Sequence, residues 1–532
     1  MNRFGREPQQ VSLAPGWHLR RIGTSAQLLG ANGVRFGPDG RLYIAQAMGS
    51  QISALDVDSA AIEVVVPVGG GIFEPDDLAF DRHGTIYATE IMEGRVGARM
   101  PNGQTRVIAD QLIAVNGISI HEDRIFADEF RPGGRMWELY PDGRSPRLIA
   151  ENLPAPNALS LGADGYLYFP TVFANEIWRV PVGGGEAERF IGGLSRPVAV
   201  KFDSKGNLFA ANSRTGEIVK IDAQSRTFDV VARTRSGNDN FAFGPDDRLF
   251  ISHFIDGGVS EAAAGGRERV IVPPALVGPW GLCFDREGSL IVADGISLAR
   301  LGANGTYEHF GTLVTDRYYP GILRNVAVRD DGSYLIVNSS GELVAYEPEC
   351  SKQAVLSGLG QIMGFVQLPG DIVVACDYEA GELVAAEPGG TRIVARGLGK
   401  PTGIALGSNG TLFVCDASEG RILTVEKGEI RLVADGLVEP HGITIVGAKA
   451  YVLDRAMRQV HQIGLDDGSH LPIAIGLPVG AGSSPERIMP GMFGLDPRPI
   501  LPFSGLTSDP SGKLYISADG DGSVWVLSHG MN

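Results

Sequence analysis

Cysteine is scarce in this sequence, and the few that occur lie far apart. The 532 residues include four cysteines, Cys283, Cys350, Cys376 and Cys415, and no two have the C-x-x-C spacing of zinc or redox motifs. Neither a disulfide framework nor a thiolate metal centre is therefore expected. We expect buried free thiols in a reducing compartment, which favours a cytoplasmic protein.

Long apolar runs and an excess of basic charge are also missing. No apolar stretch approaches the roughly 20 residues that a membrane-spanning helix needs, and the first residues lack the apolar core of a signal peptide. Lysine and arginine number 46 against 62 aspartates and glutamates, and the net charge of −16 repels phosphate backbones. We expect neither membrane insertion nor nucleic acid binding. Nucleophile-elbow, P-loop and dinucleotide-binding motifs are likewise absent from the sequence.

Glycine, in contrast, is abundant, and its 73 residues mark a repeat. Residues 32–46 read NGVRFGPDGRLYIAQ, and the same pattern recurs at 198–212 (VAVKFDSKGNLFAAN) and 402–416 (TGIALGSNGTLFVCD). An alternating apolar strand, a turn with glycine and a second apolar strand predict a β-hairpin. Two further short strands follow each hairpin. Four strands in a repeat of about 40 residues are typical of a β-propeller blade.

Twelve such repeats predict two rings. Their first residues are 39–44 residues apart, except for one step of 63: Asn32, Asp76, Asn116, Asn157, Val198, Asp239, Trp280, Arg324, Met363, Thr402, His441 and Ser504. Because a propeller ring holds four to eight blades, we predict an all-β chain of two tandem six-bladed β-propellers with twelve four-stranded blades.

The count of strands suggests how the rings close. The last repeat lacks a fourth strand, and an extra candidate at 26–29 precedes the first repeat. If each ring takes its outermost strand from its own N-terminal side, residues 269–272 complete the second ring. The propellers then span 1–262 and 263–532. Without this exchange, the boundary moves to about residue 275. A glycine- and proline-rich insertion at 476–503, with Met489, Met492 and Phe493, is expected to form a lid or a contact between the rings.

One rim of the first propeller gathers oxygen-bearing side chains. The residue that opens the innermost strand (the opener) and the residue that ends the second strand (the strand-b end) lie at the same mouth of the channel. Five of the six openers there are Asn or Asp. Such oxygens suit a hard cation, so we expect a divalent metal, Ca²⁺ above others, at Asp76, Asn116, Asn157 and Asp239. The alternative is that these side chains cap the turns before the strands.

The strand-b ends differ between the two propellers. The second propeller repeats Asp there, which suggests a structural acceptor for the loop after the strand. The first propeller has Gln46, Glu90, Glu129, Thr171, Asn212 and His253 instead. We interpret this replacement as functional, with Asp239, Glu90, Glu129 and His253 as catalytic candidates. Asn32, Gln46 and Asn212 are the candidates for binding substrate.

The openers of the second propeller do not form a comparable set of oxygen ligands. Trp280, Arg324 and His441 suit an aromatic or anionic group, and packing of the channel is the alternative.

These repeats resemble those of NHL-type propellers and of the senescence-marker-protein/gluconolactonase family, with its relatives diisopropylfluorophosphatase and strictosidine synthase. The resemblance implies a divalent metal at the channel mouth, held by the Glu of an E-G-P motif and by Asn and Asp at the openers. Asn116, Asn157 and Asp239 match such positions. Asn32 stands in place of the E-G-P glutamate, and Val198 in place of the family's Asp in blade five.

The residues and the resemblance together predict a metal-dependent hydrolase of a lactone or other ester. The metal polarises the carbonyl, and Asp239 or a neighbouring Glu acts as base. Two alternatives stay open: a non-enzymatic module that binds a small molecule or a protein, and a metal-independent lyase or condensing enzyme on the same fold. The expected partner is a small-molecule substrate, and homo-oligomerisation is a further hypothesis.

Overall fold

The computed structural model describes residues 10–262, 265–302, 304–313, 315–481 and 501–530. Throughout these residues the regular structure is β-strand, arranged as twelve antiparallel sheets, eleven of four strands and one of five. The described chain has no helix that is long and apolar enough to cross a membrane. The prediction of an all-β chain with twelve blades is confirmed.

The first blade shows how the local sequence forms each sheet. β3 (Ala31–Phe36), β4 (Leu42–Gln46), β5 (Gln51–Leu55) and β6 (Ile62–Val66) pair in chain order, which we label strands a to d from the channel outward. Gly40, with φ of +79°, makes the turn between β3 and β4 in a left-handed conformation that side chains disfavour. β4 and β5 are buried throughout, whereas β6 includes exposed residues because it forms the outer edge of the blade.

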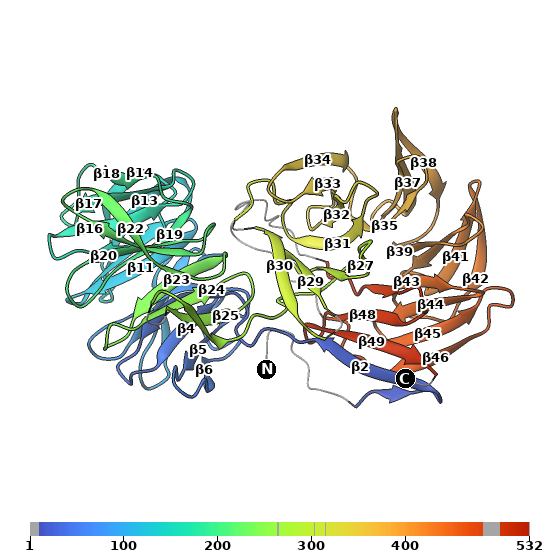
Figure 1. The fold of residues 1–532 in the computed structure, drawn as a ribbon, viewed down its shortest axis with the longest axis horizontal. Helices are drawn as coiled ribbons and strands as arrows, with labels where there is room; N and C mark the ends of the chain where they lie inside the picture. The colour runs from blue at the N-terminus through green and yellow to red at the C-terminus, as the bar shows by residue number, and fades with distance from the viewer. Residues whose placement is uncertain (1–9, 263–264, 303, 314, 482–500, 531–532) are drawn as a thin grey trace. The chain divides into compact units, whose positions relative to one another are not determined.

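The first propeller comprises residues 26–275 of the chain, drawn from blue to green in Figure 1. Its other blades are β7 (Pro75–Phe80), β8 (Ile86–Glu90), β9 (Arg95–Arg99) and β10 (Thr105–Ala109); β11 (Val115–His121), β12 (Arg124–Glu129), β13 (Pro132–Leu139) and β14 (Arg147–Pro154); β15 (Ser160–Leu161), β16 (Tyr166–Thr171), β17 (Glu176–Pro181) and β18 (Glu188–Gly192); β19 (Pro197–Phe202), β20 (Leu208–Asn212), β21 (Glu217–Asp222) and β22 (Thr227–Arg233); β23 (Asn238–Phe243), β24 (Leu249–His253), β25 (Gly258–Ala262) and β26 (Glu268–Val272). Ser252 Oγ in the sixth blade donates to the Asn32 carbonyl in the first (2.6 Å), which joins the ends of the ring.

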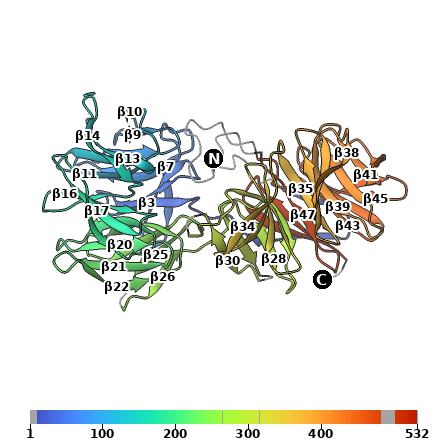
Figure 2. The ribbon, with the colours of Figure 1, turned by 90° about the horizontal axis from the view of Figure 1, so that it is seen from above.

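The second propeller runs from yellow to red in Figures 1 and 2. Its blades are β27 (Leu282–Phe284), β28 (Leu290–Ala293), β29 (Ser297–Leu301) and β30 (Tyr307–Thr312); β31 (Leu323–Val328), β32 (Tyr334–Asn338), β33 (Leu343–Glu347) and β34 (Ser351–Leu356); β35 (Ile362–Leu368), β36 (Ile372–Asp377), β37 (Glu382–Glu387) and β38 (Gly390–Arg396); β39 (Pro401–Leu406), β40 (Leu412–Asp416), β41 (Arg421–Glu426) and β42 (Glu429–Ala434); β43 (Pro440–Val446), β44 (Lys449–Asp454), β45 (Gln459–Gly464) and β46 (His470–Ile475); β47 (Leu506–Ser508), β48 (Leu514–Ala518) and β49 (Ser523–His529).

The N-terminal segment completes the second propeller. β2 (Trp17–Gly23) pairs with β49 in a register that sets Trp17 opposite His529, and the blue strand lies beside the red ones in Figure 1. β1 (Ser12–Leu13) adds to the outer edge of β46. The final blade has only three strands of its own, so β2 covers an edge that would otherwise expose unpaired backbone groups.

The sequence analysis expected residues 26–29 to complete the first ring and residues 269–272 to complete the second, and the structure differs on both points. Residues 269–272 pair with β25 inside the first propeller, and 26–29 form bends and turns instead of a strand. The two units divide after Ala275, with the N-terminal strands in the second. Of the 476–503 insertion, residues 482–500 lie outside the described residues.

The four cysteines are free. Cys376 and Cys415 are buried, whereas Cys350 is exposed, so the expectation of burial is wrong for Cys350.

Candidate functional site

The strand-b ends hold the loop that leads into strand a of the same blade. In the second propeller, Asp454 Oδ2 accepts the N–H of Val438 (2.7 Å) and Asp416 Oδ1 that of Lys400 (3.0 Å). Both also accept an N–H of the loop after strand b, as expected for a structural residue. In the first propeller, Gln46, Glu90, Glu129 and Asn212 make the same kind of contact, whereas Thr171 donates to the Glu176 carbonyl (3.2 Å).

Glu90 and Glu129 act as such structural acceptors. Glu90 Oε2 accepts the N–H of Phe73 (2.8 Å), and Glu129 Oε1 accepts that of Ile113 (3.2 Å). Each carboxylate also binds arginine, Arg95 for Glu90 (2.7 Å) and Arg135 for Glu129 (2.6 Å). Burial raises the pKa of Glu90, whereas for Glu129 arginine and tryptophan donors outweigh burial and hold the pKa below its usual value. The replacement of Asp by Glu therefore preserves the structural contact.

The remaining strand-b candidates are also occupied within their own blades. Gln46 Oε1 accepts the N–H of Leu29 (2.9 Å), and Asn212 Oδ1 accepts that of Ser195 (3.2 Å). His253 Nε2 lies 3.1 Å from Ser260 Oγ in β25, so this imidazole faces the outer strands of its blade. Of the catalytic candidates, Asp239 is the one that lies near another opener, Asp76.

The openers of the first propeller form a polar cluster at the channel mouth. Asn32 Nδ2 donates to Asp76 Oδ1 (2.9 Å) from the neighbouring blade. Burial raises the pKa of Asp76 well above its usual range, and the Asp239 carboxylate adds to this shift. Burial, with a further contribution from Asp77, raises the pKa of Asp239 to about 7. The two carboxylates therefore repel each other across the blade that separates them.

The two other expected metal ligands differ from each other. Asn116 Oδ1 is buried, and no hydrogen-bond partner for it is found in the described chain. Asn157 Oδ1 accepts the N–H of the next residue, Ala158 (2.7 Å), which lies after the opener and not in the turn before it. Asn116 thus has an acceptor oxygen to offer a cation, whereas that of Asn157 is already engaged.

Two further aspartates, which the sequence analysis did not identify, lie beneath the openers. Asp77 accepts N–H groups of Leu78 (2.9 Å) and Ile118 (3.2 Å), which links blades two and three. Asp128, at the penultimate position of β12, accepts the N–H of Gly117 (3.0 Å). Burial raises the pKa of Asp128 well above its usual value, and Asp77 contributes further. The sequence signal is that the other blades of the first propeller have uncharged residues where Asp128 lies: Ala45, Thr89, Pro170, Ala211 and Ser252.

Two basic residues, Arg35 and Lys201, lie three positions after the opener in the innermost strands of blades one and five. Arg35 donates to the carbonyls of Leu78 (3.4 Å) and Ile118 (3.1 Å). Lys201 is 3% exposed, and its Nζ has no hydrogen-bond partner in the described chain. Burial lowers the pKa of Lys201 to about 7, with Arg35 lowering it and Asp77 and Asp128 opposing the shift.

The charges of this channel fit a divalent cation. Four described carboxylates, Asp76, Asp77, Asp128 and Asp239, face two described cations, Arg35 and Lys201, which leaves two negative charges when all are ionised. Uncompensated buried charge is costly, and one divalent ion would neutralise it. No group of three or more His, Cys, Asp or Glu in the described residues has the arrangement of a metal site. The expected ligand set instead combines two carboxylates, Asp76 and Asp239, with amide oxygens.

The loops beside this cluster are apolar on one side of the mouth. Three large side chains there are exposed, Phe73 by 38%, Ile113 by 42% and Phe173 by 47%. They belong to loops at the opener end of blades two, three and four. Phe130 stacks on Phe173 with ring centroids 6.0 Å apart. The mouth thus combines a polar channel with an apolar border.

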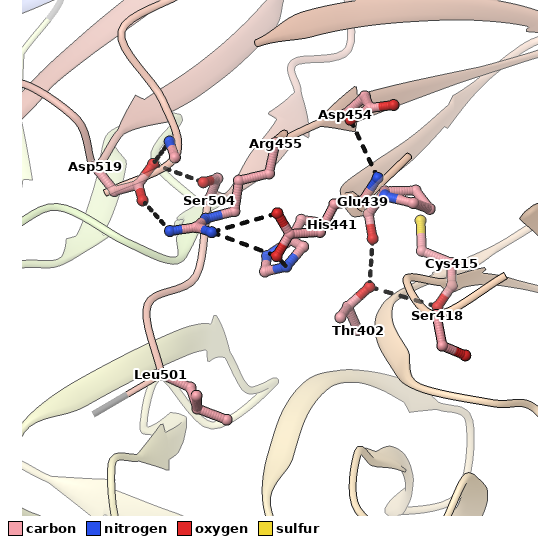
Figure 3. Close-up of polar contacts among 12 residues, drawn as sticks. Thr402, Cys415, Ser418, Glu439, His441, Asp454, Arg455, Leu501, Ser504 and Asp519 are labelled. Carbon is pink, nitrogen blue, oxygen red and sulfur yellow. Dashed lines mark hydrogen bonds and ion pairs between the residues drawn. The ribbon is translucent and has the colours of Figure 1, made fainter. Parts of the chain in front are cut away.

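The second propeller has a different polar cluster (Figure 3). His441, Glu439, Arg455, Ser504 and Asp519 lie together at the opener end of blades five and six, and Figure 3 shows Arg455 between Asp519 and Glu439. Of the two other expected binding residues, Trp280 is half-buried, and Arg324 is fully buried and donates to the carbonyls of Ile362 (2.8 Å) and Leu501 (3.2 Å).

Comparison with known proteins gives one similarity in sequence and several in structure. No family model matches the chain. Gluconolactonase of Zymomonas mobilis is 28% identical over 200 residues, covering 34% of this chain and 49% of that protein. The chain therefore spans about half the length of this curated relative.

Two solved structures are similar to parts of the chain. Virginiamycin B lyase from Staphylococcus aureus has 19% identity and a TM-score of 0.39, covering 52% of this chain and 96% of that one. A gluconolactonase from Xanthomonas campestris has 17% identity and a TM-score of 0.38, covering 45% and 88%. The strand pairing defines the chain as a tandem six-bladed β-propeller protein. Within that class, its sequence similarity is to the gluconolactonase-like β-propellers.

Proposed function

We propose that the first propeller is a metal-dependent hydrolase of a lactone or other ester. The observation that carries this proposal is the excess of buried carboxylate in its channel, where burial and the neighbouring Asp239 and Asp77 raise the cost of ionising Asp76. The similarity to a gluconolactonase supports a lactone as the substrate class.

The residues have separate roles in this proposal. Asp76, Asp239 and the amide oxygen of Asn116 would hold a Ca²⁺-like ion, with Asn157 at the same mouth. When bound, such an ion polarises an ester carbonyl and lowers the pKa of a bound water. Asp239 is more exposed than the other acidic opener, so it is the carboxylate placed to take the proton of an attacking water. Arg35 and Lys201 balance the charge below.

The apolar side of the mouth favours a substrate with an apolar substituent. Phe73, Ile113 and Phe173 would lie against that substituent while the ester group reaches the polar channel.

Metal analysis and calorimetry test this proposal. Protein purified without chelator is expected to contain about one divalent ion per chain, and added Ca²⁺ is expected to raise the melting temperature after chelation. Glucono-δ-lactone and γ-alkyl lactones are then assayed by proton release. Asp239→Asn is expected to abolish metal-dependent turnover. A bound ion without turnover of any ester would favour the binding module, and absence of both ion and turnover would exclude the proposal.

A further inference from the structure

The second propeller contains a chain of charged side chains that the proposed function does not use (Figure 3). The chain begins at Asp519, which accepts from Ser504 Oγ (2.6 Å) and from the N–H groups of Gly480 (2.9 Å) and Ala481 (2.9 Å). The guanidinium of Arg455 lies between Asp519 (3.3 Å) and Glu439 (3.4 Å). Glu439 Oε1 in turn lies 3.5 Å from Nε2 of His441. Each group thereby orients the next, and the chain ends at an imidazole.

The charges of this chain are paired, in contrast to the first propeller. Asp519 and Glu439 share Arg455, and His441 faces Glu439. The contact with His441 holds the pKa of Glu439 below its usual value, Arg455 adds to this effect, and burial opposes it. Glu439 is therefore ionised at neutral pH. With a neutral His441 ring, Asp519, Glu439 and Arg455 together carry one negative charge, against two in the channel of the first propeller.

The contact with Glu439 decides which nitrogen of His441 carries the proton. An ionised carboxylate only accepts hydrogen bonds, so Nε2 holds the hydrogen and Nδ1 presents a lone pair in the neutral ring. His441 is 4% exposed, and its Nδ1 has no partner in the described chain. The same holds for the Nε–H of Arg455. The cluster thus offers one buried acceptor and one buried donor, both on residues that contact Glu439.

The surroundings supply apolar surface. The ring of Phe503 lies 5.9 Å from the ring of His441. Tyr378 is close enough to Glu439 and Arg455 for both charges to influence its pKa, which burial raises. Arg324, whose guanidinium binds backbone carbonyls, has a structural role here.

We propose that the second propeller carries a separate hydrolytic site for small carboxylic esters that needs no metal ion. His441 Nδ1 accepts a proton from water as the water oxygen bonds to the ester carbonyl carbon. The Nε–H of Arg455 donates to the carbonyl oxygen as it gains charge. The bond from that carbon to the alcohol oxygen then breaks, and the proton on His441 passes to the departing alcohol. The products are a carboxylic acid and an alcohol.

The test uses p-nitrophenyl acetate and full-length protein stripped of metal by a chelator. Wild type is expected to keep a saturable activity, which His441→Gln lowers at least tenfold. His470→Gln, at an exposed position of β46 in the same blade, is the matched control and leaves the rate unchanged. The chelator removes the metal-dependent activity proposed for the first propeller from this rate, which separates the two propellers.

Two further measurements guard against a folding defect. Each variant is compared with wild type by melting temperature, and imidazole is added to His441→Gly, where it should restore at least part of the rate. Glu439→Gln, which removes a positioning residue, is expected to lower kcat with little change in KM. A rate that vanishes with chelation, or that His441→Gln leaves within twofold of wild type, overturns the proposal whatever the first propeller does.

Discussion

Lys201 is the residue that departs most from ordinary behaviour in this protein. A lysine that is 3% exposed, and whose ammonium group has no hydrogen-bond partner in the described chain, is costly unless its charge serves a purpose. Asp77 and Asp128 favour its charged form, whereas Arg35 and burial disfavour it. We interpret Lys201 as part of the charge balance of the channel, next to the acidic openers.

Lys201→Met is expected to stabilise the metal-free protein, and the gain should depend on pH. Lowering the lysine pKa from 10.5 to about 7 costs the folded state about 5 kcal/mol at neutral pH. Between pH 7 and about 10.5 the unfolded chain binds more protons, so the stability of wild type rises with pH across this window. The advantage of the variant should therefore be largest at or below pH 7 and decline towards pH 10.

Denaturant unfolding at several pH values in chelator measures this dependence. Lys205→Met, at an exposed turn position, serves as the control and should show no such trend. A constant difference between Lys201→Met and wild type from pH 6 to 10 would contradict the interpretation.

At the scale of the element, the strand-b end holds the loop before its own blade. Glu129→Ala is expected to destabilise the protein by about 2–3 kcal/mol, because the N–H of Ile113 and two arginines lose their acceptor. Asp416→Ala in the second propeller should cost a similar amount. Glu129→Gln should keep metal-dependent turnover within about threefold of wild type, whereas loss of a catalytic base would reduce it a hundredfold or more.

The loops of the mouth make a prediction about specificity. Phe173→Ser should lower kcat/KM about tenfold for a lactone with a long alkyl chain, because the burial of apolar surface against this ring is lost. Hydrolysis of an unsubstituted lactone should not change. Leu148→Ser, at an exposed position of the outer strand β14, is the control. Equal losses for both lactones would place Phe173 outside the substrate contact.

At the scale of the molecule, the two ends of the chain meet in one blade. Deletion of the chain up to Gly23 removes the strand that pairs with β49, so it should lower the stability of the second propeller. Hydrogen exchange should show lost protection in β47–β49, while strands β3–β26 stay protected. Loss of protection throughout the first propeller would mean that the two propellers do not fold as separate units.

Local pattern was enough to determine the blades of this protein. Each hairpin is specified by its own alternation of apolar residues and by a turn such as that at Gly40, so the sequence alone determined the all-β class, the twelve repeats and the oxygen-rich openers. Asp76, Asn32 and Asp239 were identified in this way, since one position in every repeat faces the channel mouth.

Tertiary structure alone decided which of these residues act together. Pairing of Trp17 with His529 joins segments from opposite ends of the chain, and no local pattern specifies such a contact. The strand-b glutamates were misinterpreted for a similar reason, because their role depends on which backbone groups the folded loop presents. Asp128 and Lys201 lie in blades three and five, so their convergence with the openers follows from closure of the ring, which brings charges of distant repeats into one channel of low dielectric.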